Sequence, residues 1–321
     1  MATVNNISPA PKVVALGGGH GLSVTLQALR QVTDRVTAVV GVADDGGSSG
    51  RLRREFGILP PGDLRMAVAA LCGNDVASRA WADVLQYRFG GEGDLAGHAV
   101  GNLLMAALWE NSSDAVAGLQ ELGSLVGAVG QVLPCSVDPL EIVAGIRGHE
   151  ESRPDELIEV RGQVEIATTP GRVEIVRIEP AGARPCIQAL QAIDDADAIV
   201  LGPGSWFTSL MPHLLMPTQG EHVESAPGRR ILVLNLDPQE GETEDFSPAE
   251  HIDAITGLAP KMRFDVVIAD SRHMGSGKAR ANLVAACRGW DAEVIESEVA
   301  GKGDRHDPGK LARVFDTVLA G

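Results

Sequence analysis

Residues 13–29 combine three features that restrict the fold more than any other stretch of this chain. An apolar run at residues 13–16 is followed by a glycine-rich segment, and leucines then recur with helical spacing. This order is typical of a strand, a glycine loop and a helix in an α/β protein. Because backbone N–H groups at such a helix N-terminus attract phosphate, we expect a Rossmann-like fold with a phosphorylated ligand at this loop. The candidate residues are Gly17, Gly18, Gly19 and Gly21.

The glycine loop matches the dinucleotide-binding fingerprint only in part. That fingerprint has glycine at relative positions one, three and six, where this chain has Gly17, Gly19 and Leu22. The third glycine normally lets the helix pack closely on its strand. Its absence argues against a nicotinamide or flavin cofactor and leaves phosphate binding intact. A plain tight turn is the alternative interpretation, although consecutive glycines cost conformational entropy.

A second polar segment follows the next expected strand, at residues 36–43. Its sequence, DDGGSSGRLRREFG at residues 44–57, predicts a second glycine-rich loop, which should line the same crevice of a parallel sheet. Adjacent carboxylates suit Mg²⁺ or a ribose diol, whereas serine hydroxyls and arginine suit phosphate. A solvated loop with a helix N-cap is the alternative. The candidate residues are Asp44, Asp45, Gly46, Gly47, Ser48, Ser49 and Arg51.

Three further stretches contribute candidate ligand-binding residues. Arg65 is a candidate for phosphate, while Asp63 is equally well explained as a complement to a helix dipole. Gly101 and Asn102 lie in an apolar helical pattern, where glycine costs roughly 1 kcal/mol relative to alanine, so close packing or ligand approach is expected. The sequence GPGSWFTS after residue 201 predicts another strand-loop-helix anion site. Its candidate residues are Gly202, Gly204, Ser205 and Thr208.

Hydrophobic periodicity predicts one α/β domain instead of two. We expect a flexible tail at residues 1–11 and, at residues 12–321, a Rossmann-like three-layer αβα domain with a mostly parallel sheet. A helical insertion is expected at about residues 60–128 and a small antiparallel β insertion at about residues 131–180. Further strands are expected at residues 198–201, 231–236 and 266–269, and helices at residues 77–87, 96–109, 114–125, 186–193 and 248–258.

Charge and composition limit the partners of this chain. A formal net charge of −16 argues against binding to a nucleic-acid backbone. No apolar run is long enough for a membrane span, and residues 1–12 lack the apolar core of a signal peptide, so a cytoplasmic location is expected. The sequence has no nucleophile elbow, Walker motif, zinc-protease motif or kinase signature. Four widely spaced cysteines are expected to be buried thiols: Cys72, Cys135, Cys186 and Cys287.

Six stretches, in order from residue 13 to residue 252, together resemble the gluconeogenesis-factor branch of the CofD-like family. They are VVALGGGHGLS, VADDGGSSGRLR, LPPGDLR, LAGHAVGNLL, LGPGSWFTSL and LDPQEGETEDFSPAEHI. The resemblance implies a Rossmann-like αβα fold and a nucleotide-sugar ligand, UDP-N-acetylglucosamine. It also implies a link to gluconeogenic carbon metabolism, envelope precursor supply and cell shape. Two residues depart from the family pattern: His20 stands where many relatives have threonine, and Phe246 where tyrosine is common.

The preferred interpretation is a regulatory protein that binds a UDP-sugar, with the phosphates on the first and last glycine loops and the second loop closing the site. The alternative is a Mg²⁺-dependent nucleotidyl or 2-phospho-L-lactate-type transferase, in which Asp44 or Asp45 holds the metal. Such an enzyme would act by positioning and charge neutralisation. An NAD-dependent oxidoreductase is a weaker third interpretation. The sequence leaves open catalytic turnover, Mg²⁺ as a cofactor and a homo-oligomeric state.

Overall fold

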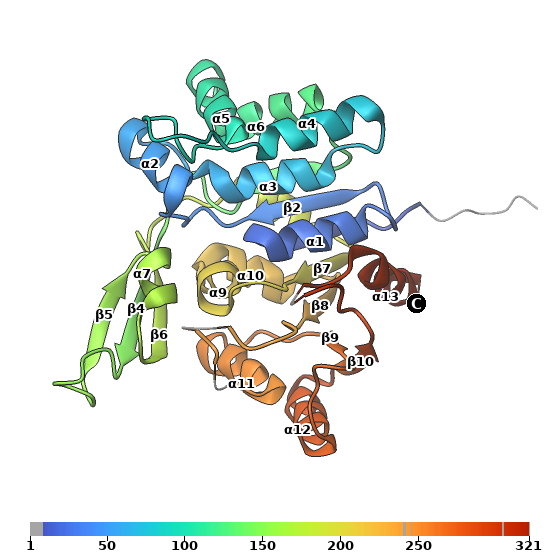
Figure 1. Ribbon diagram of the computed structural model, residues 1–321. Helices are drawn as coiled ribbons and strands as arrows, with labels where there is room; N and C mark the ends of the chain where they lie inside the picture. Colours follow the sequence, from blue (N-terminus) through green and yellow to red (C-terminus); the bar gives the residue numbers. More distant parts are fainter. Residues whose placement is uncertain (1–8, 240–241, 245, 304, 321) are drawn as a thin grey trace, which may run out of the picture.

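The computed structural model describes residues 9–239, 242–244, 246–303 and 305–320, and within them a parallel sheet lies between layers of helices (Figure 1). Of the tail expected at residues 1–11, residues 1–8 lie outside the described residues. The expected Rossmann-like αβα fold is confirmed. From edge to edge the sheet consists of β10 (Glu293–Ser297), β9 (Val266–Asp270), β8 (Arg229–Val233), β7 (Ala198–Leu201), β1 (Val13–Gly17), β2 (Val36–Val40) and β3 (Gln131–Pro134).

The position of β1 decides where the sheet can bind a ligand. All five residues of β1 are buried, and the strand pairs in parallel with β2 on one side and β7 on the other. The chain adds β2 and β3 on the first side and β7 to β10 on the second, so the strand order reverses between β1 and β7. In open α/β sheets such a reversal opens a crevice at the carboxyl ends of the two strands, where ligands bind.

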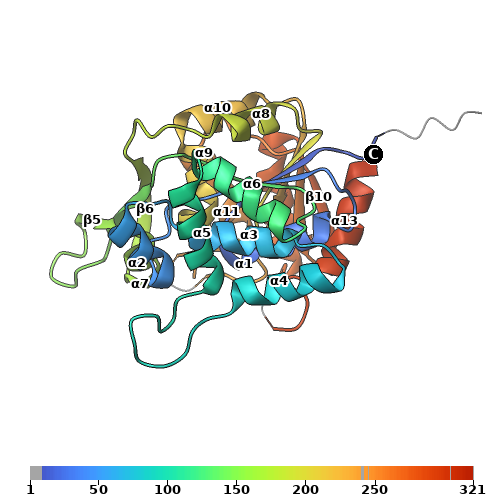
Figure 2. The same cartoon turned by 90° about the horizontal axis from the view of Figure 1, so that it is seen from above.

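Helices cover both faces of the sheet (Figure 2). One face carries α1 (Gly19–Leu29), α3 (Pro61–Leu71) and α13 (Pro308–Ala320), and the other carries α8 (Ile187–Asp194) and α10 (Pro217–Ser225). As the leucine spacing predicted, α1 buries Leu22, Leu26 and Leu29. The other helices are α2 (Gly47–Phe56), α4 (Val76–Gln86), α5 (Val100–Asn111), α6 (Ala115–Leu125), α7 (Gln163–Thr168), the π-helical η1 (Trp206–Leu210), α9 (Met211–Leu215), α11 (Pro248–Leu258), α12 (Gly277–Cys287) and the 3₁₀ turn η2 (Arg288–Trp290).

Both expected insertions are present. Helices α3 to α6 follow β2 and precede β3 along the chain, and they pack against one another. A three-stranded antiparallel sheet, in the order β5 (Leu157–Arg161), β4 (Glu141–Arg147) and β6 (Arg172–Glu179), follows β3, with α7 between β5 and β6. Figure 1 shows this small sheet standing beyond the end of the main sheet toward which β2 points. It is therefore placed to wall the crevice.

The prediction that residues 44–57 form a loop was wrong, because residues 47–56 form α2. Gly46 precedes the helix in an extended conformation, and Gly57 ends it with a φ of 66°, a left-handed conformation that favours glycine. Arg53 and Arg54 in the last turn complement the helix dipole. The serines of this segment consequently lie in the first turn of a helix.

Other boundaries differ by a few residues. The helix expected at residues 96–109 begins only at Val100, because the preceding residues form a loop whose two ends are joined by an isolated β-bridge between Arg88 and Ala99. Strand β2 ends at Val40, and β8 spans Arg229–Val233. All four cysteines are free and buried, as expected.

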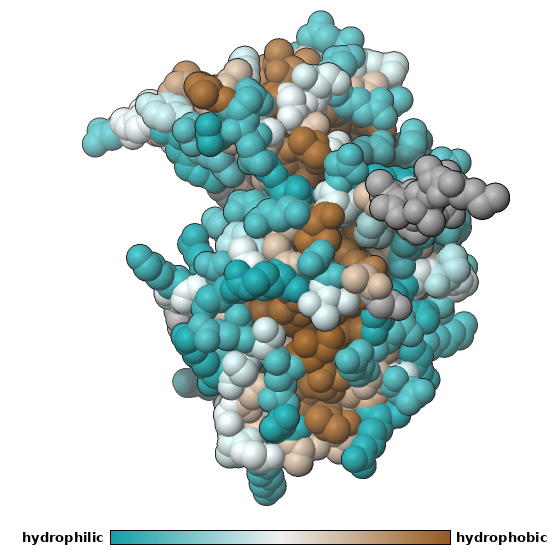
Figure 3. Space-filling view, turned by 90° about the vertical axis from the view of Figure 1, so that its right-hand side faces the viewer, coloured by the Kyte–Doolittle hydropathy of each residue, from teal (hydrophilic) through white to brown (hydrophobic). Residues whose placement is uncertain are grey.

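Hydrophobic side chains are exposed on the side of the molecule away from the antiparallel sheet (Figure 3). There a strip of hydrophobic residues runs between hydrophilic ones (Figure 3). None of the helices in the described part of the chain has both the length and the apolar character that crossing a bilayer requires.

Candidate functional site

The glycine loops after β1 and β7 meet across the crevice. A Cβ on Gly21, in the first turn of α1, would lie 2.0 Å from the carbonyl oxygen of Pro203. Behind this contact the Thr25 hydroxyl donates a hydrogen bond of 2.9 Å to the carbonyl of Gly202. The first and last glycine loops, which the sequence predicts separately, therefore pack against each other.

Hydrogen bonds to the carbonyl of Gly17 hold the start of the loop after β1 in place. Gly17 has a φ of 155° and Gly19 a φ of 58°, so both conformations favour glycine. The carbonyl of Gly17 accepts hydrogen bonds from the Gly41 amide, at 2.9 Å, and from Nε2 of His213, at 3.1 Å. Burial lowers the pKa of His213 to about 4, so this imidazole is neutral and donates through Nε2. The loop can therefore present its amides without rearranging.

An acidic side chain lies at the start of α1. A Cβ on Gly18 would lie only 2.4 Å from Oδ2 of Asp63. Burial and, next, the charge of Asp44 raise the pKa of Asp63 to about 7, against smaller opposite effects of the Gly19 amide and Arg65. Asp63 thus changes its charge near neutral pH, beside the loop expected to bind phosphate.

Asp44 and Asp45, the candidate Mg²⁺ ligands, use their carboxylates in different places. Oδ1 of Asp44 accepts a hydrogen bond of 2.9 Å from the Gly46 amide. Oδ1 of Asp45 accepts one of 3.1 Å from the Val164 amide at the start of α7. Asp45 therefore fastens the antiparallel insertion to the crevice, and the carboxylate that interacts with Asp44 is that of Asp63.

The pair of Asp44 and Asp63 offers the oxygen ligands that Mg²⁺ prefers. Within the described ranges, no three His, Cys, Asp or Glu side chains come together as a metal-binding group. A Mg²⁺ ion at this pair would consequently take most of its coordination from phosphate oxygens and water.

The serines of the second segment are buried and already hydrogen-bonded. Nδ2 of Asn102 donates to Oγ of Ser48 at 3.0 Å, and the Ser48 hydroxyl lies 2.9 Å from Nδ1 of His98. Burial, followed by the charge of Arg51, lowers the pKa of His98, which favours the neutral ring that can accept a hydrogen bond from the Ser48 hydroxyl at Nδ1. Oγ of Ser49 accepts from the Gly62 amide at 2.9 Å. These hydroxyls join α2 to α3 and α5.

The two candidate phosphate-binding arginines are engaged by the protein itself. Arg51 donates to the carbonyl of Ala96 at 2.7 Å. Arg65 is 2% exposed and donates to the side chain of Gln86. Burial and, next, the charge of Arg88 lower the pKa of Arg65 to about 10. Both guanidinium groups therefore support the helical insertion.

The positive charges of three arginines from distant segments nevertheless act on His20, in the first turn of α1. Burial and the charges of Arg305, Arg65 and Arg88 lower the pKa of His20. Arg88 and Arg305 were not predicted from the sequence, since each lies in a loop remote from the glycine motifs. In a chain with a net charge of −16, these positive charges favour an anion near His20.

The loop after β7 is clamped by two residues that the sequence analysis did not single out. The Gly204 amide donates to Oδ1 of Asn235 at 2.9 Å, and Nδ2 of Asn235 donates back to the Gly204 carbonyl at 2.8 Å. The hydroxyls of Ser205 and Thr208, expected on phosphate, both contact the carboxylate of Glu242. The signal for Glu242 was its place in LDPQEGETEDFSPAEHI, which follows Asn235 directly.

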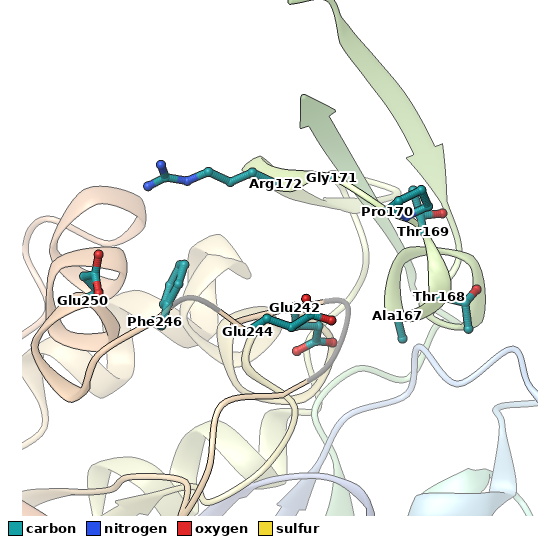
Figure 4. A pocket seen from close by; sticks show the side chains of 10 residues that line it. All are labelled: Ala167, Thr168, Thr169, Pro170, Gly171, Arg172, Glu242, Glu244, Phe246 and Glu250. Atoms are coloured by element: carbon teal, nitrogen blue, oxygen red, sulfur yellow. The ribbon is translucent and has the colours of Figure 1, made fainter. Parts of the chain in front are cut away.

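A cavity of about 830 Å³ adjoins this loop, within the size range of small-molecule sites (Figure 4). Figure 4 shows Arg172 extending from the antiparallel insertion toward Glu250, with Phe246, Glu244 and Glu242 along the opposite side. The lining residues are Ala167, Thr168, Thr169, Pro170, Gly171, Arg172, Glu242, Glu244, Phe246 and Glu250.

Phe246 contributes only an apolar ring to this cavity. Its ring meets the ring of Phe207 edge to face, with centroids 6.2 Å apart, and that of His251 at 5.4 Å. Phenylalanine has no hydroxyl group, so the Phe246 side chain offers a ligand no hydrogen bond.

Comparison with known proteins identifies the class to which this fold and site belong. The chain belongs to the CofD family, because the family model described as 2-phospho-L-lactate transferase CofD matches residues 13–298. A crystal structure of a UPF0052 family protein from Bacillus halodurans matches with a TM-score of 0.82 and 30% sequence identity, covering 94% of this chain and 97% of that one.

Full-length relatives narrow this class to the gluconeogenesis-factor type. The gluconeogenesis factor of Bacillus subtilis (strain 168) is 34% identical over 322 residues, covering 96% of this chain and 98% of the relative. A Mycobacterium tuberculosis (strain H37Rv) protein is 49% identical over 309 residues, covering 96% of this chain and 90% of the relative. The resemblance stated from the six sequence stretches is thus confirmed.

Proposed function

We propose that this protein binds a nucleotide sugar, UDP-N-acetylglucosamine, and acts as a cytoplasmic regulatory protein of the gluconeogenesis-factor type. Its role would connect carbon metabolism with envelope precursor supply and cell shape. The ligand's phosphates would lie between the loops after β1 and β7, and its sugar or base would extend toward the adjoining cavity.

One observation carries this proposal. The contact of Gly21 with Pro203 joins two glycine loops of the kind that bind phosphate, at the point where the strand order reverses. Three arginines whose charges act on His20, in the first turn of α1, supply positive charge for a diphosphate. The cavity next to the loop after β7 is large enough for a small polar ring. Glycine loops, positive charge and space near one end of the sheet together support this proposal.

A transferase is the second candidate function, and two observations favour it. The matching family model is described as 2-phospho-L-lactate transferase, and Asp44 and Asp63 form an acidic pair beside the first glycine loop. These carboxylates would hold Mg²⁺, which neutralises phosphate charge when bound. Asp63 would have to be ionised to do so, whereas the protein alone keeps its pKa near 7.

Thermal unfolding with added ligands tests the binding proposal. UDP-N-acetylglucosamine should raise the unfolding midpoint more than UDP at equal concentration, and N-acetylglucosamine alone should have little effect, because binding to the folded state stabilises it by mass action. The absence of a shift with both UDP compounds would argue against a UDP-sugar ligand.

A further inference from the structure

The Ser205–Thr208 site, predicted from sequence to bind phosphate, holds a carboxylate of the protein itself. The hydroxyl of Ser205 lies 2.5 Å from Oε1 of Glu242, and that of Thr208 lies 2.9 Å from the same oxygen. The backbone amide of Phe207 donates to Oε2 of Glu242 at 3.2 Å. Glu242 is 9% exposed, so its charged group is largely withdrawn from water.

These contacts have the chemistry of a phosphate site. Two hydroxyls and a backbone amide are donors that bind phosphoryl oxygens, and all three converge here on one anion. Each of these donors is neutral, so the carboxylate is bound by hydrogen bonds to groups that carry no compensating charge. A phosphate with more charge and more acceptor oxygens can use the same donors.

The neighbouring space allows the exchange. Glu242 also lines the cavity of about 830 Å³, and Figure 4 shows its side chain at that cavity near Glu244. A turn of the Glu242 side chain into this space would free Ser205, Thr208 and the Phe207 amide.

We propose that the Glu242 carboxylate is an internal competitor for a phosphate group of the ligand, occupying the Ser205–Thr208 donors until phosphate displaces its side chain. This inference rests on the proposed function for the identity of the full ligand, but the competition itself concerns phosphate alone. The affinity for the ligand is therefore lower than the three donors would give without Glu242. When phosphate binds, the displaced carboxylate moves into the cavity and adds a negative charge there.

Calorimetric titration with inorganic pyrophosphate tests the competition without a sugar or base. Glu242→Ala should bind pyrophosphate at least about fivefold more tightly than the wild type, because it frees donors whose hydrogen bonds each contribute on the order of 1 kcal/mol. Glu244→Ala is the matched control, since it removes the same charge from the same cavity and should change the affinity less than about twofold. Adding Thr208→Val to Glu242→Ala should cancel the gain.

The outcomes separate this inference from the proposed function. Equal or weaker pyrophosphate binding by Glu242→Ala, or no binding by any variant, overturns the competition. A gain with pyrophosphate while UDP-N-acetylglucosamine binds neither protein supports the competition and rejects the UDP-sugar. Thermal unfolding of each variant checks that it is folded. A gain of equal size in Glu244→Ala would assign the effect to general charge and so overturn the inference.

Discussion

The Pro203 carbonyl oxygen occupies the place where a side chain on Gly21 would begin, 2.0 Å from the ideal Cβ position. This contact joins α1 to the loop after β7 across the reversal of strand order. The dinucleotide fingerprint has its helix-packing glycine one position later, where this chain has Leu22. In this chain Gly21, instead of residue 22, is the glycine that close packing requires in the first turn of α1. Gly21 packs against the loop after β7.

Replacing Gly21 with alanine should therefore be destabilising. The added methyl group meets backbone that cannot turn away, and overpacking of this kind costs about 1–3 kcal/mol. Urea unfolding measures the loss. The control is Gly257→Ala in α11, where no atom lies within 4 Å of the new Cβ and alanine should stabilise the helix by up to about 1 kcal/mol. Equal stability of Gly21→Ala and wild type would show that the loops do not touch.

Asp63 should make stability depend on pH. Its pKa is about 7 in the folded protein and near 3.8 in the unfolded chain, so the folded state holds the proton more tightly. Stability from this group is complete below about pH 4 and is lost as the pH rises to about 7. The shift corresponds to at most roughly 4 kcal/mol, and to less because the side chain is partly exposed.

Asp63→Asn should remove this dependence. Relative to wild type, the variant should gain about 1–3 kcal/mol in unfolding free energy between pH 5 and pH 8. Asp75→Asn at the N-cap of α4 is the control, because hydrogen bonds from Ser78 lower the pKa of Asp75 and it stays ionised in that range. A difference between Asp63→Asn and wild type that is the same at both pH values contradicts the shifted pKa.

How far the sequence predicts this structure depends on how local the responsible interactions are. The leucines of α1 and the apolar run of β1 follow local patterns, and both elements were predicted correctly. The segment with Ser48 looked like a loop because its glycines and serines are poor helix formers, whereas its burial beneath His98 and Asn102 stabilises a helix. Arg88 and Arg305 reach the site through tertiary packing, which no spacing along the chain records, whereas Glu242 had its place in the stretch after Asn235 as a signal.

Arg51→Ala should weaken UDP-N-acetylglucosamine binding more than Arg79→Ala, although Arg51 is not free for a phosphate. Arg51 donates a hydrogen bond to Ala96 in the loop before α5, close to the pair formed by His98 and Ser48. Arg79, in contrast, is exposed on α4. Loss of this support should lower the affinity about tenfold, the equivalent of one charge-assisted hydrogen bond. Calorimetry on both variants decides, and equal affinities would separate α2 from the ligand site.

Asp44→Asn and Asp45→Asn should differ, because only Asp44 lies with Asp63. If Mg²⁺ and turnover belong to this site, Asp44→Asn should abolish Mg²⁺-dependent activity, while Asp45→Asn should mainly loosen α7 from the crevice. For a regulatory protein we expect ligand binding without Mg²⁺ and reduced affinity in at least one variant. Unchanged affinity and no Mg²⁺ effect in both variants would exclude both carboxylates from ligand binding.

The central claim is that the crevice between the β1 and β7 loops binds a nucleotide sugar. Titration calorimetry of the wild-type protein with UDP-N-acetylglucosamine, NAD and GTP, each with and without Mg²⁺, tests this claim most directly. The account predicts that UDP-N-acetylglucosamine binds without Mg²⁺ and more tightly than NAD or GTP, since the phosphate loops are present and the dinucleotide glycine is not. Binding of NAD with no binding of UDP-N-acetylglucosamine would contradict it.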